Sequence, residues 1–520
     1  MRDEPAVEEG LNRLRYRFGF LAQPTGATPG ELARKFGRWG WASEAIGGFT
    51  LRTHPETTKE VLRRGDVAMV FLGDVFDEAG EAIGDWLRRF EPADERALHE
   101  ALDSLGGRFA LLVFDGGRMR VYHDPIGSRS VYYHATGAGS VSSHSGLLAA
   151  AVDAGRCPQM ARYVARRHYV RHPAKCLPGD RTLYRGILGL IPNNLYDSSG
   201  GLRRYWPREP LARIEPDAFF AQVDRSLSAL AGYVRPRYRP VFGLTGGADT
   251  RVAVAAFRSQ GVSFDTVTWG HSRLFPGERT IVDGLAEYLG APHAHLTKGP
   301  LNEALDKLAR RNSGALYSAP RTMDLLRERI GGRPDHAFIR GWGAEIMRGF
   351  YNLHREPMKD LSAAEMARAY ASPSWKGARR QETEAYFAEF RDRAGYAALG
   401  DLGIDPNDLF YWEHRMGMWC PGAMNVFDLA MPTLVAFNSR RLYAAAWGLP
   451  RAERLSKELF LRIVARHDPK LAAFPLAVKP ERGAASKASD KLKAGSGAVK
   501  RGLQGLARRS GLSQGRRRRG

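Results

Sequence analysis

The sequence predicts an α/β protein with a β-rich N-terminal part and a later part built around a parallel sheet. Residues 1–150 contain short apolar runs separated by glycine-containing turns, which is typical of closely spaced strands. From about residue 236, apolar strands alternate with helical segments, the pattern of a parallel sheet flanked by helices. A chain of 520 residues is also too long for one core, so we expect two or three domains.

The predicted strands of the N-terminal part come from three apolar patterns. Residues 67–72 and 109–114 are continuous apolar runs, and residues 119–122 alternate after the Asp115-Gly-Gly turn. Residues 151–235 mix short helices with turns rich in glycine and proline, so we expect a linker region there. The predicted domains are therefore residues 1–150, the linker, a third segment at 236–483 and a tail at 484–520.

The third segment alternates regularly between strand and helix. Residues 240–243 and 262–269 predict strands, and residues 249–260 and 279–289 predict helices, the second ended by Gly290. Further along the chain, residues 300–330 and 358–398 predict amphipathic helices. Ligands of parallel sheets bind at the carboxyl ends of the strands, so the turn that follows Gly243 is the predicted site.

That turn has the composition of an anion-binding loop. Two adjacent glycines let backbone N–H groups approach a ligand closely, and the following helix adds partial positive charge. Thr245 and Thr250 carry hydroxyl donors, whereas Asp249 would repel a bare phosphate and so indicates a bridging Mg²⁺. No Gly-Lys-Ser/Thr follows, which excludes a lysine P-loop. An ordinary loop is the alternative. The predicted nucleotide ligands here are Leu244, Thr245, Gly246, Gly247, Asp249 and Thr250.

The cysteine and charge content limits the possible classes of protein. Three widely spaced cysteines and no Cys-x-x-Cys pair argue against a disulfide framework or a zinc site. The N-terminus is charged and no long apolar run occurs, so we expect a soluble cytoplasmic protein. Of the net charge of +22, the last 41 residues supply +10, without aromatics. We expect a disordered tail with weak contact to anionic surfaces, RNA or membrane docking being the alternative.

Several segments match one family. The loop 244–250 resembles the Ser-Gly-Gly-x-Asp-Ser loop of ATP pyrophosphatases, and residues 105–115 and 123–133 resemble a strand and a hairpin of the asparagine synthetase family. Residues 182–187 and 204–206 resemble that family's linker. Up to about residue 483, the chain is thus similar to this family. The resemblance implies an amidotransferase-like (Ntn) β-sandwich domain, followed by an adenine-nucleotide α-hydrolase-like synthetase domain.

The half that resembles an amidotransferase lacks the residues that glutamine hydrolysis needs. Glutamine hydrolysis in the family needs an N-terminal cysteine whose α-amine acts as base. Phe18 holds that position here, 17 residues precede it, and no cysteine occurs before Cys157. The family's Asn-Gly-Glu segment reads Leu72-Gly73-Asp74. We therefore expect no glutamine hydrolysis.

The resemblance assigns roles in the synthetase half. Trp269 falls where the family meets adenine, a packed core aromatic being the alternative. Residues 338–351 resemble the Ser-Gly-x-Gly-x-Asp-Glu segment, which places Arg340 and Gly341 at the nucleotide and Glu345 at the metal with Asp249. Trp342 and Ile346 depart from the acidic or polar residues of that segment, which leaves a helix start with a buried tryptophan as the alternative.

Two further residues are predicted to be catalytic. Asp428 matches the carboxylate of Glu-x-Arg-x-Pro, although Ala430 replaces the arginine and a turn before Pro432 is the alternative. Lys479 matches the family's lysine, whose charge would stabilise the transition states, and solvated charge near the tail is the alternative. Lys457 is more in keeping with an exposed helix residue or a phosphate contact.

The resemblance implies an ATP-dependent amide ligase that releases pyrophosphate and uses ATP and Mg²⁺. Its partners would be a small-molecule or peptide carboxylate and a nitrogen nucleophile: ammonia, an amine or an internal amino group, as in β-lactam and lasso-peptide macrolactam synthetases. Asparagine biosynthesis stays open but is not favoured by the lost residues. A catalytically drifted nucleotide-binding regulator and a tRNA-modifying enzyme are the alternatives, and the sequence leaves the oligomeric state open, with a homodimer among the options.

Overall fold

The structure is a computed structural model. It describes residues 10–90, 94–136, 139–166, 169–170, 175–269, 277–331, 335–371, 377–400, 402–456 and 458–477. The predicted basic tail and the residues Lys457 and Lys479 lie outside the described part of the chain.

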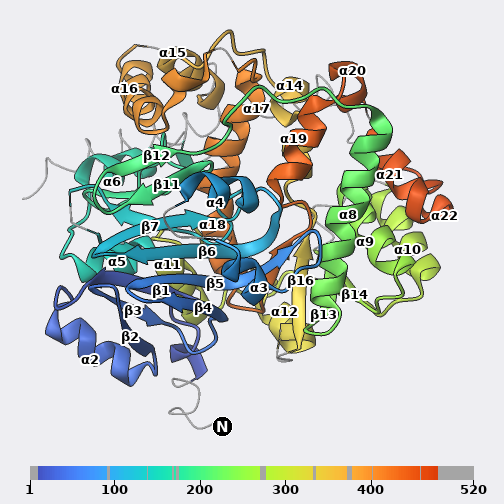
Figure 1. The fold of residues 1–520 in the computed structure, drawn as a ribbon. Helices are drawn as coiled ribbons and strands as arrows, with labels where there is room; N and C mark the ends of the chain where they lie inside the picture. The colour runs from blue at the N-terminus through green and yellow to red at the C-terminus, as the bar shows by residue number, and fades with distance from the viewer. Residues whose placement is uncertain are drawn as a thin grey trace, which may run out of the picture.

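Two six-stranded antiparallel sheets form the N-terminal part (Figure 1). Their inner faces pack on each other through a shared apolar cluster that includes Phe20 and Leu51 from one sheet and Val70 and Leu112 from the other. The first sheet has the order β10 (Ile187–Gly189), β8 (Tyr132–His134), β9 (Val141–Ser142), β1 (Phe20–Pro24), β3 (Phe49–Thr53) and β2 (Ala42–Ile46). The second has the order β12 (Gly201–Arg204), β11 (Asn194–Asp197), β7 (Arg118–His123), β6 (Leu105–Asp115), β5 (Val67–Asp77) and β4 (Lys59–Arg64).

The predicted N-terminal strands are present, and the sandwich extends past residue 150. The runs at 67–72, 109–114 and 119–122 lie in β5, β6 and β7. Strands β10, β11 and β12 come from the segment predicted as linker, yet they pair with sandwich strands. Their partners are distant in sequence, so no local pattern reveals this pairing. The helices of this part are α2 (Gly30–Arg38), α3 (Ile83–Arg88), α4 (Glu95–Leu102), α5 (Ser145–Ala151) and α6 (Pro158–Ala165).

A five-stranded parallel sheet forms the centre of the later part, as the strand–helix alternation predicts. Helices α8 (Pro216–Val234), α9 (Ala248–Ser259), α10 (Glu278–Leu289), α21 (Leu459–His467) and α22 (Pro469–Ala472) lie to one side of it in Figure 1. Gly290 ends α10 in the left-handed conformation, as predicted. The strand order is β15 (His293–Leu296), β14 (Asp265–Trp269), β13 (Arg239–Gly243), β16 (His336–Arg340) and β17 (Thr433–Val435).

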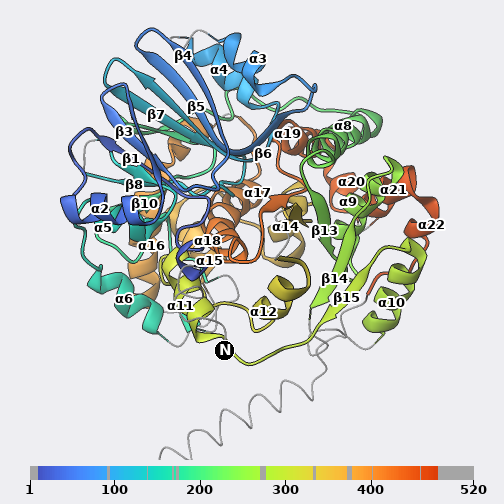
Figure 2. The same cartoon turned by 90° about the horizontal axis from the view of Figure 1, so that it is seen from below.

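Of the remaining helices, α17 and α18 lie between the sandwich and the parallel sheet in Figure 2, and α14, α15, α16 and α20 lie at the top of the molecule in Figure 1. Trp412 connects the two halves by donating its indole N–H to the Pro125 carbonyl at 2.7 Å. These segments are α11 (Glu303–Asn312), α12 (Met323–Leu326), the π-helix Arg327–Gly331, α13 (Ala344–Met347), α14 (Phe350–His354), α15 (Ala363–Tyr370), α16 (Ala378–Arg393), the 3₁₀-helix Tyr396–Leu399, α17 (Pro406–Phe410), the π-helix Tyr411–Met416, α18 (Gly417–Phe427), α19 (Arg440–Gly448) and α20 (Arg451–Arg454).

Candidate active site

The 244–250 loop connects β13 to α9 at the carboxyl edge of the parallel sheet. Strand β13 lies between β14 and β16, with Gly243 level with Val267 and Phe242 level with Ile339. The ends of these three parallel strands therefore meet at one edge, and the residues that follow them are neighbours. Helix α9 begins at Ala248, so Asp249 and Thr250 lie in its first turn.

Glycine is required where this loop and the next one approach their neighbours. A β-carbon at Gly246 would lie 2.4 Å from the Ala477 β-carbon, and one at Gly341 would lie 3.1 Å from the Thr250 nitrogen. The segment after β16 thus rests directly on the first turn of α9, and the chain near residue 477 rests on the loop. Three segments distant in sequence meet at this point.

The loop N–H groups already meet oxygen acceptors. The Gly246 N–H donates to Glu278 Oε1 at 3.2 Å, and the Gly247 N–H donates to Thr245 Oγ1 at 3.2 Å. An anionic oxygen from Glu278 therefore occupies the kind of position that a phosphate oxygen takes at such a loop. Sequence reasoning missed Glu278, because it opens α10 and carries no motif.

Asp249 and Glu345 form a pair of carboxylates at this edge. Glu345 lies in the first turn of α13, which begins after Gly343 at φ +89°. Burial, and then the neighbouring charge of Asp249, raise the pKa of Glu345 to about 7. Burial also raises the pKa of Asp249, against the opposing effect of Arg348, whose Nη2 lies 3.2 Å from the Asp249 carboxylate. The structure thus brings together the two residues predicted to share a metal ion.

The pair has capacity to bind a cation. Glu345 Oε2 is buried and accepts no hydrogen bond from the described residues. Those residues include no group of three or more His, Cys, Asp or Glu side chains that could hold a metal by themselves. Mg²⁺ commonly binds through one or two carboxylates together with waters and substrate phosphates, so two carboxylates beside an anion-binding loop fit this ion.

Arg251 attaches a C-terminal segment to the loop. Its guanidinium donates to the carbonyls of Phe474 at 2.7 Å, Pro475 at 2.6 Å and Gly246 at 3.2 Å. The Ala477 N–H also donates to the Gly246 carbonyl at 2.9 Å. The chain is therefore held at the loop two residues before Lys479, which itself lies outside the described residues.

Trp269 and Arg340 are the last residues of β14 and β16, and both lie in an aromatic cluster. Trp269 packs near Phe338 and Phe427, with ring centroids 5.7 and 5.8 Å away, and stays partly exposed. This packing agrees with the predicted core alternative and leaves its adenine contact a prediction. The Arg340 guanidinium carbon lies 3.7 Å from the centre of the Phe427 ring. Burial lowers the pKa of Arg340 to about 9.

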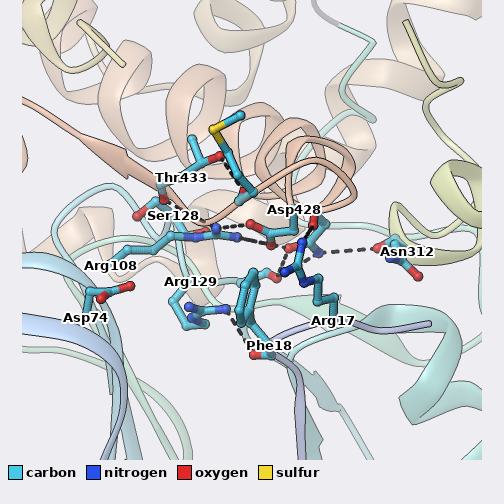
Figure 3. A network of polar contacts seen from close by, with 12 residues as sticks. Arg17, Phe18, Asp74, Arg108, Ser128, Arg129, Asn312, Asp428 and Thr433 are labelled. Atoms are coloured by element: carbon cyan, nitrogen blue, oxygen red, sulfur yellow. Dashed lines mark hydrogen bonds and ion pairs between the residues drawn. The ribbon is translucent and has the colours of Figure 1, made fainter. Parts of the chain in front are cut away.

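The structure gives Asp428 a buried ion-pair partner, and its catalytic role stays a prediction. Both its carboxylate oxygens accept from Arg108 of β6, at 2.5 and 2.7 Å, and each side chain is 1% exposed (Figure 3). Its backbone carbonyl accepts from Arg17 at 2.8 Å. Asp428 thus joins the later part of the chain to the sandwich by a buried ion pair. The motif match did not predict this partner, which lies 320 residues away.

Phe18 lies on the sandwich side of the same network (Figure 3). It is 7% exposed, has a φ of +56°, and its carbonyl accepts from Arg129 Nη1 at 3.0 Å. Gly73 lies on the other side of Arg129, since a β-carbon there would be 3.0 Å from Arg129 Nε. The structure therefore brings together Phe18 and the 72–74 segment, at which the sequence resemblance predicts the loss of glutamine hydrolysis.

Comparisons with known proteins leave the family open. No protein-family model and no curated protein matches the chain. Among solved structures, a glutamine phosphoribosylpyrophosphate amidotransferase from B. subtilis, complexed with ADP and GMP, matches at 13% identity, 68% coverage of this chain and 75% of that chain, with a TM-score of 0.22. A structure described as the allosteric regulatory enzyme of purine biosynthesis matches at 12% identity, 66% and 74% coverage, with a TM-score of 0.22. Scores this low support no inference about function.

In the part of the chain that the structure describes, no helix combines the length and the apolar character needed to cross a membrane.

Proposed function

We propose that this chain is an ATP-dependent amide ligase that activates a carboxylate as its adenylate and releases pyrophosphate. One observation carries the proposal: the glycine loop of residues 244–250 and the Asp249–Glu345 carboxylate pair lie together at the carboxyl edge of a parallel sheet. In the same proposal, the sheet belongs to an adenine-nucleotide α-hydrolase-like domain, and the sandwich is a degenerate Ntn amidotransferase-like domain of the asparagine synthetase family.

The loop residues would bind the nucleotide phosphates. The N–H groups of Gly246 and Gly247 would donate to phosphate oxygens once Glu278 and Thr245 release them, and the hydroxyls of Thr245 and Thr250 would add donors. Asp249 and Glu345 would hold Mg²⁺, which supplies positive charge to neutralise the departing pyrophosphate. The unpartnered Glu345 Oε2 supports this assignment among the described residues.

Basic residues around the loop would stabilise negative charge in the transition state. Arg348 lies 3.2 Å from Asp249, and Lys479 follows the segment that Arg251 holds at the loop. A fixed positive charge placed where negative charge develops stabilises the transition state more than the ground state. The nitrogen would come from ammonia, an amine or an amino group on the substrate, because Phe18 replaces the cysteine that glutamine hydrolysis needs.

Carboxylate-dependent exchange of labelled pyrophosphate into ATP tests the proposal. We expect exchange with at least one member of a broad panel of carboxylic acids, and a fall of at least about 100-fold in Asp249→Asn and Glu345→Gln, since groups that stabilise developing charge are commonly worth this much. Asp66→Asn, in the exposed turn between β4 and β5, is the matched control and should leave exchange unchanged. Exchange that survives both loop-side substitutions would overturn the proposed site.

A nucleotide-binding regulator is the second candidate, and the Arg348–Asp249 ion pair favours it. An arginine 3.2 Å from the proposed metal ligand competes with Mg²⁺ for the same carboxylate. This candidate predicts ATP binding that needs no Mg²⁺, and no pyrophosphate exchange with any acid. Calorimetric titration with ATP, with and without Mg²⁺, separates it from the ligase.

A further inference from the structure

A row of two arginine and two tryptophan side chains, in the order Arg–Trp–Trp–Arg, begins beside the candidate site. The Arg340 guanidinium carbon lies 4.8 Å from the centre of the Trp342 ring, the Trp342 and Trp419 rings are 4.7 Å apart, and the Arg415 guanidinium carbon lies 4.5 Å from the Trp419 ring centre. We call these four residues the Arg–Trp row. All four are half-buried, so each keeps some accessible surface.

Neither arginine of the row forms an ion pair with an acidic side chain of the described residues. Among the described residues, no side chain forms a hydrogen bond or ion pair with either guanidinium, and Arg340 Nε, Arg340 Nη2 and Arg415 Nη1 are buried without a partner. Aromatic faces surround Arg340 instead. A buried cation without a counter-ion is costly, and the cost falls when an anion binds to it.

The two ends of the row differ in their surroundings. Arg340 belongs to the strand end beside the 244–250 loop, because the next residue, Gly341, contacts Thr250. Arg415 lies in the π-helix Tyr411–Met416, one turn before Trp419 on α18, and its neighbours include Tyr317 and Tyr351. Its charge also acts on Glu345, where it opposes the rise in the pKa of that carboxyl.

The chemistry of the row favours an anion over an ammonium group. Tryptophan faces attract cations, but two arginines already occupy the cation positions, and a third positive charge would be repelled. Both indoles keep some exposed surface, against which the ring of a planar group can pack. An arginine at the end of such a surface presents several N–H donors that suit a carboxylate or phosphate.

We propose that the Arg–Trp row is the site for the acid that is ligated, and that this acid has a planar apolar body on Trp342 and Trp419 and a second anionic group bound by Arg415. The first carboxylate would then point to Arg340 and the loop. Only this orientation rests on the proposed ligase function. Binding of the acid to the row does not require turnover.

Four small probes show separately how charge and an aromatic ring contribute to binding. Terephthalate carries two carboxylates on an aromatic ring, benzoate carries one, trans-cyclohexane-1,4-dicarboxylate replaces the ring, and benzylamine reverses the charge. Saturation-transfer NMR titrations on the full chain without nucleotide would give their affinities. We expect terephthalate to bind about tenfold more tightly than benzoate, because a charge-assisted hydrogen bond to arginine is added. The cyclohexane acid should bind more weakly than terephthalate, and benzylamine should not bind.

Variants of the row test which residue gives each preference. Arg415→Met should bring terephthalate to the affinity of benzoate, and Trp419→Leu should remove the advantage of terephthalate over the cyclohexane acid. Arg380→Met, on the exposed face of α16, is the control and should change nothing. If Arg415→Met does not fold, Arg415→Lys keeps the charge but not the planar fork, and it should weaken terephthalate more than benzoate.

Three results would contradict the inference: no probe binds the unmodified chain, benzylamine binds best, or the Arg415 variants bind terephthalate as the unmodified chain does. Failure of the ligase proposal looks different. In that case terephthalate still binds and responds to the Arg415 variants, while no acid supports pyrophosphate exchange.

Discussion

Replacement of Asp428 by asparagine distinguishes an interdomain role for this residue from a catalytic one. The substitution removes the charge that both Nη atoms of Arg108 contact, at 2.5 and 2.7 Å, while it keeps the size of the side chain. Arg108 would retain its bonds to the carbonyls of Ser128 at 3.0 Å and Thr433 at 3.4 Å. Its positive charge would stay buried at 1% exposure without a counter-ion.

The expected loss follows from that buried charge. Breaking a fully buried ion pair by removing one partner costs about 3–5 kcal/mol, and the bonds that Arg108 keeps favour the lower end. Unfolding entropies of about 2.1 cal/mol/K per residue give about 1.1 kcal/mol/K for 520 residues, so the melting temperature should fall by about 3–5 °C if the chain unfolds as one unit. A double variant, Arg108→Met with Asp428→Leu, should recover most of the loss, because it removes both charges.

Differential scanning calorimetry measures the effect, and pyrophosphate exchange measured below the transition gives the activity. Glu100→Gln is the control, because its partner Arg96 is 87% exposed and such pairs contribute at most about 1 kcal/mol. An Asp428→Asn variant that has the melting temperature of the unmodified chain but no pyrophosphate exchange would refute the interdomain interpretation and support the predicted catalytic one.

Three further predictions concern the site. The pKa of Glu345, raised from 4.5 to about 7, means that the folded chain binds the proton more tightly, so its stability falls as pH rises from about 4.5 to 7; Glu345→Gln should flatten that decline in pH-dependent melting curves, and an unchanged decline would argue against it. Gly343→Ala should cost about 2–5 kcal/mol in thermal unfolding, since φ is +89° and a β-carbon would lie 1.9 Å from the Phe437 carbonyl oxygen, whereas Gly232→Ala, with open space around it, should not destabilise. Arg251→Met should speed deuterium uptake by the backbone of residues 473–477 and slow pyrophosphate exchange at least about tenfold, because three carbonyls lose their donor; equal rates of deuterium uptake would contradict this.

The parts of the fold that depend on local pattern could be predicted from the sequence. Continuous apolar runs predicted β5 and β6. The strand–turn–helix pattern predicted β13, α9 and β14, with bounds that agree within a few residues. The turn composition predicted the loop between β13 and α9, and its anion binding stays a prediction. The pairing of Asp249 with Glu345 needed the family resemblance in addition, because the two residues lie on different strand–helix units.

Contacts between distant segments could not be predicted. No local signal pairs Asp428 with Arg108, or assigns Arg251 to the carbonyls near residue 474. The strands β10 to β12 return to the sandwich after a helical segment. Their local sequence, rich in turns, predicts a linker instead. The Arg–Trp row combines two helices with the end of β16, and the sequence patterns that single out Arg340 and Trp342 do not link them to Arg415 and Trp419.

The fate of a carboxylate oxygen shows whether the chain forms an acyl-adenylate. The acid that gives the fastest pyrophosphate exchange would be labelled with ¹⁸O in its carboxylate and allowed to turn over with ATP and a nitrogen nucleophile, and the nucleotide product would be weighed by mass spectrometry. Ligation through an acyl-adenylate should give AMP that carries one ¹⁸O, because nitrogen attack on the acyl-adenylate leaves the bridging oxygen on the phosphate. Unlabelled AMP, or label in inorganic phosphate with ADP as the product, would contradict it.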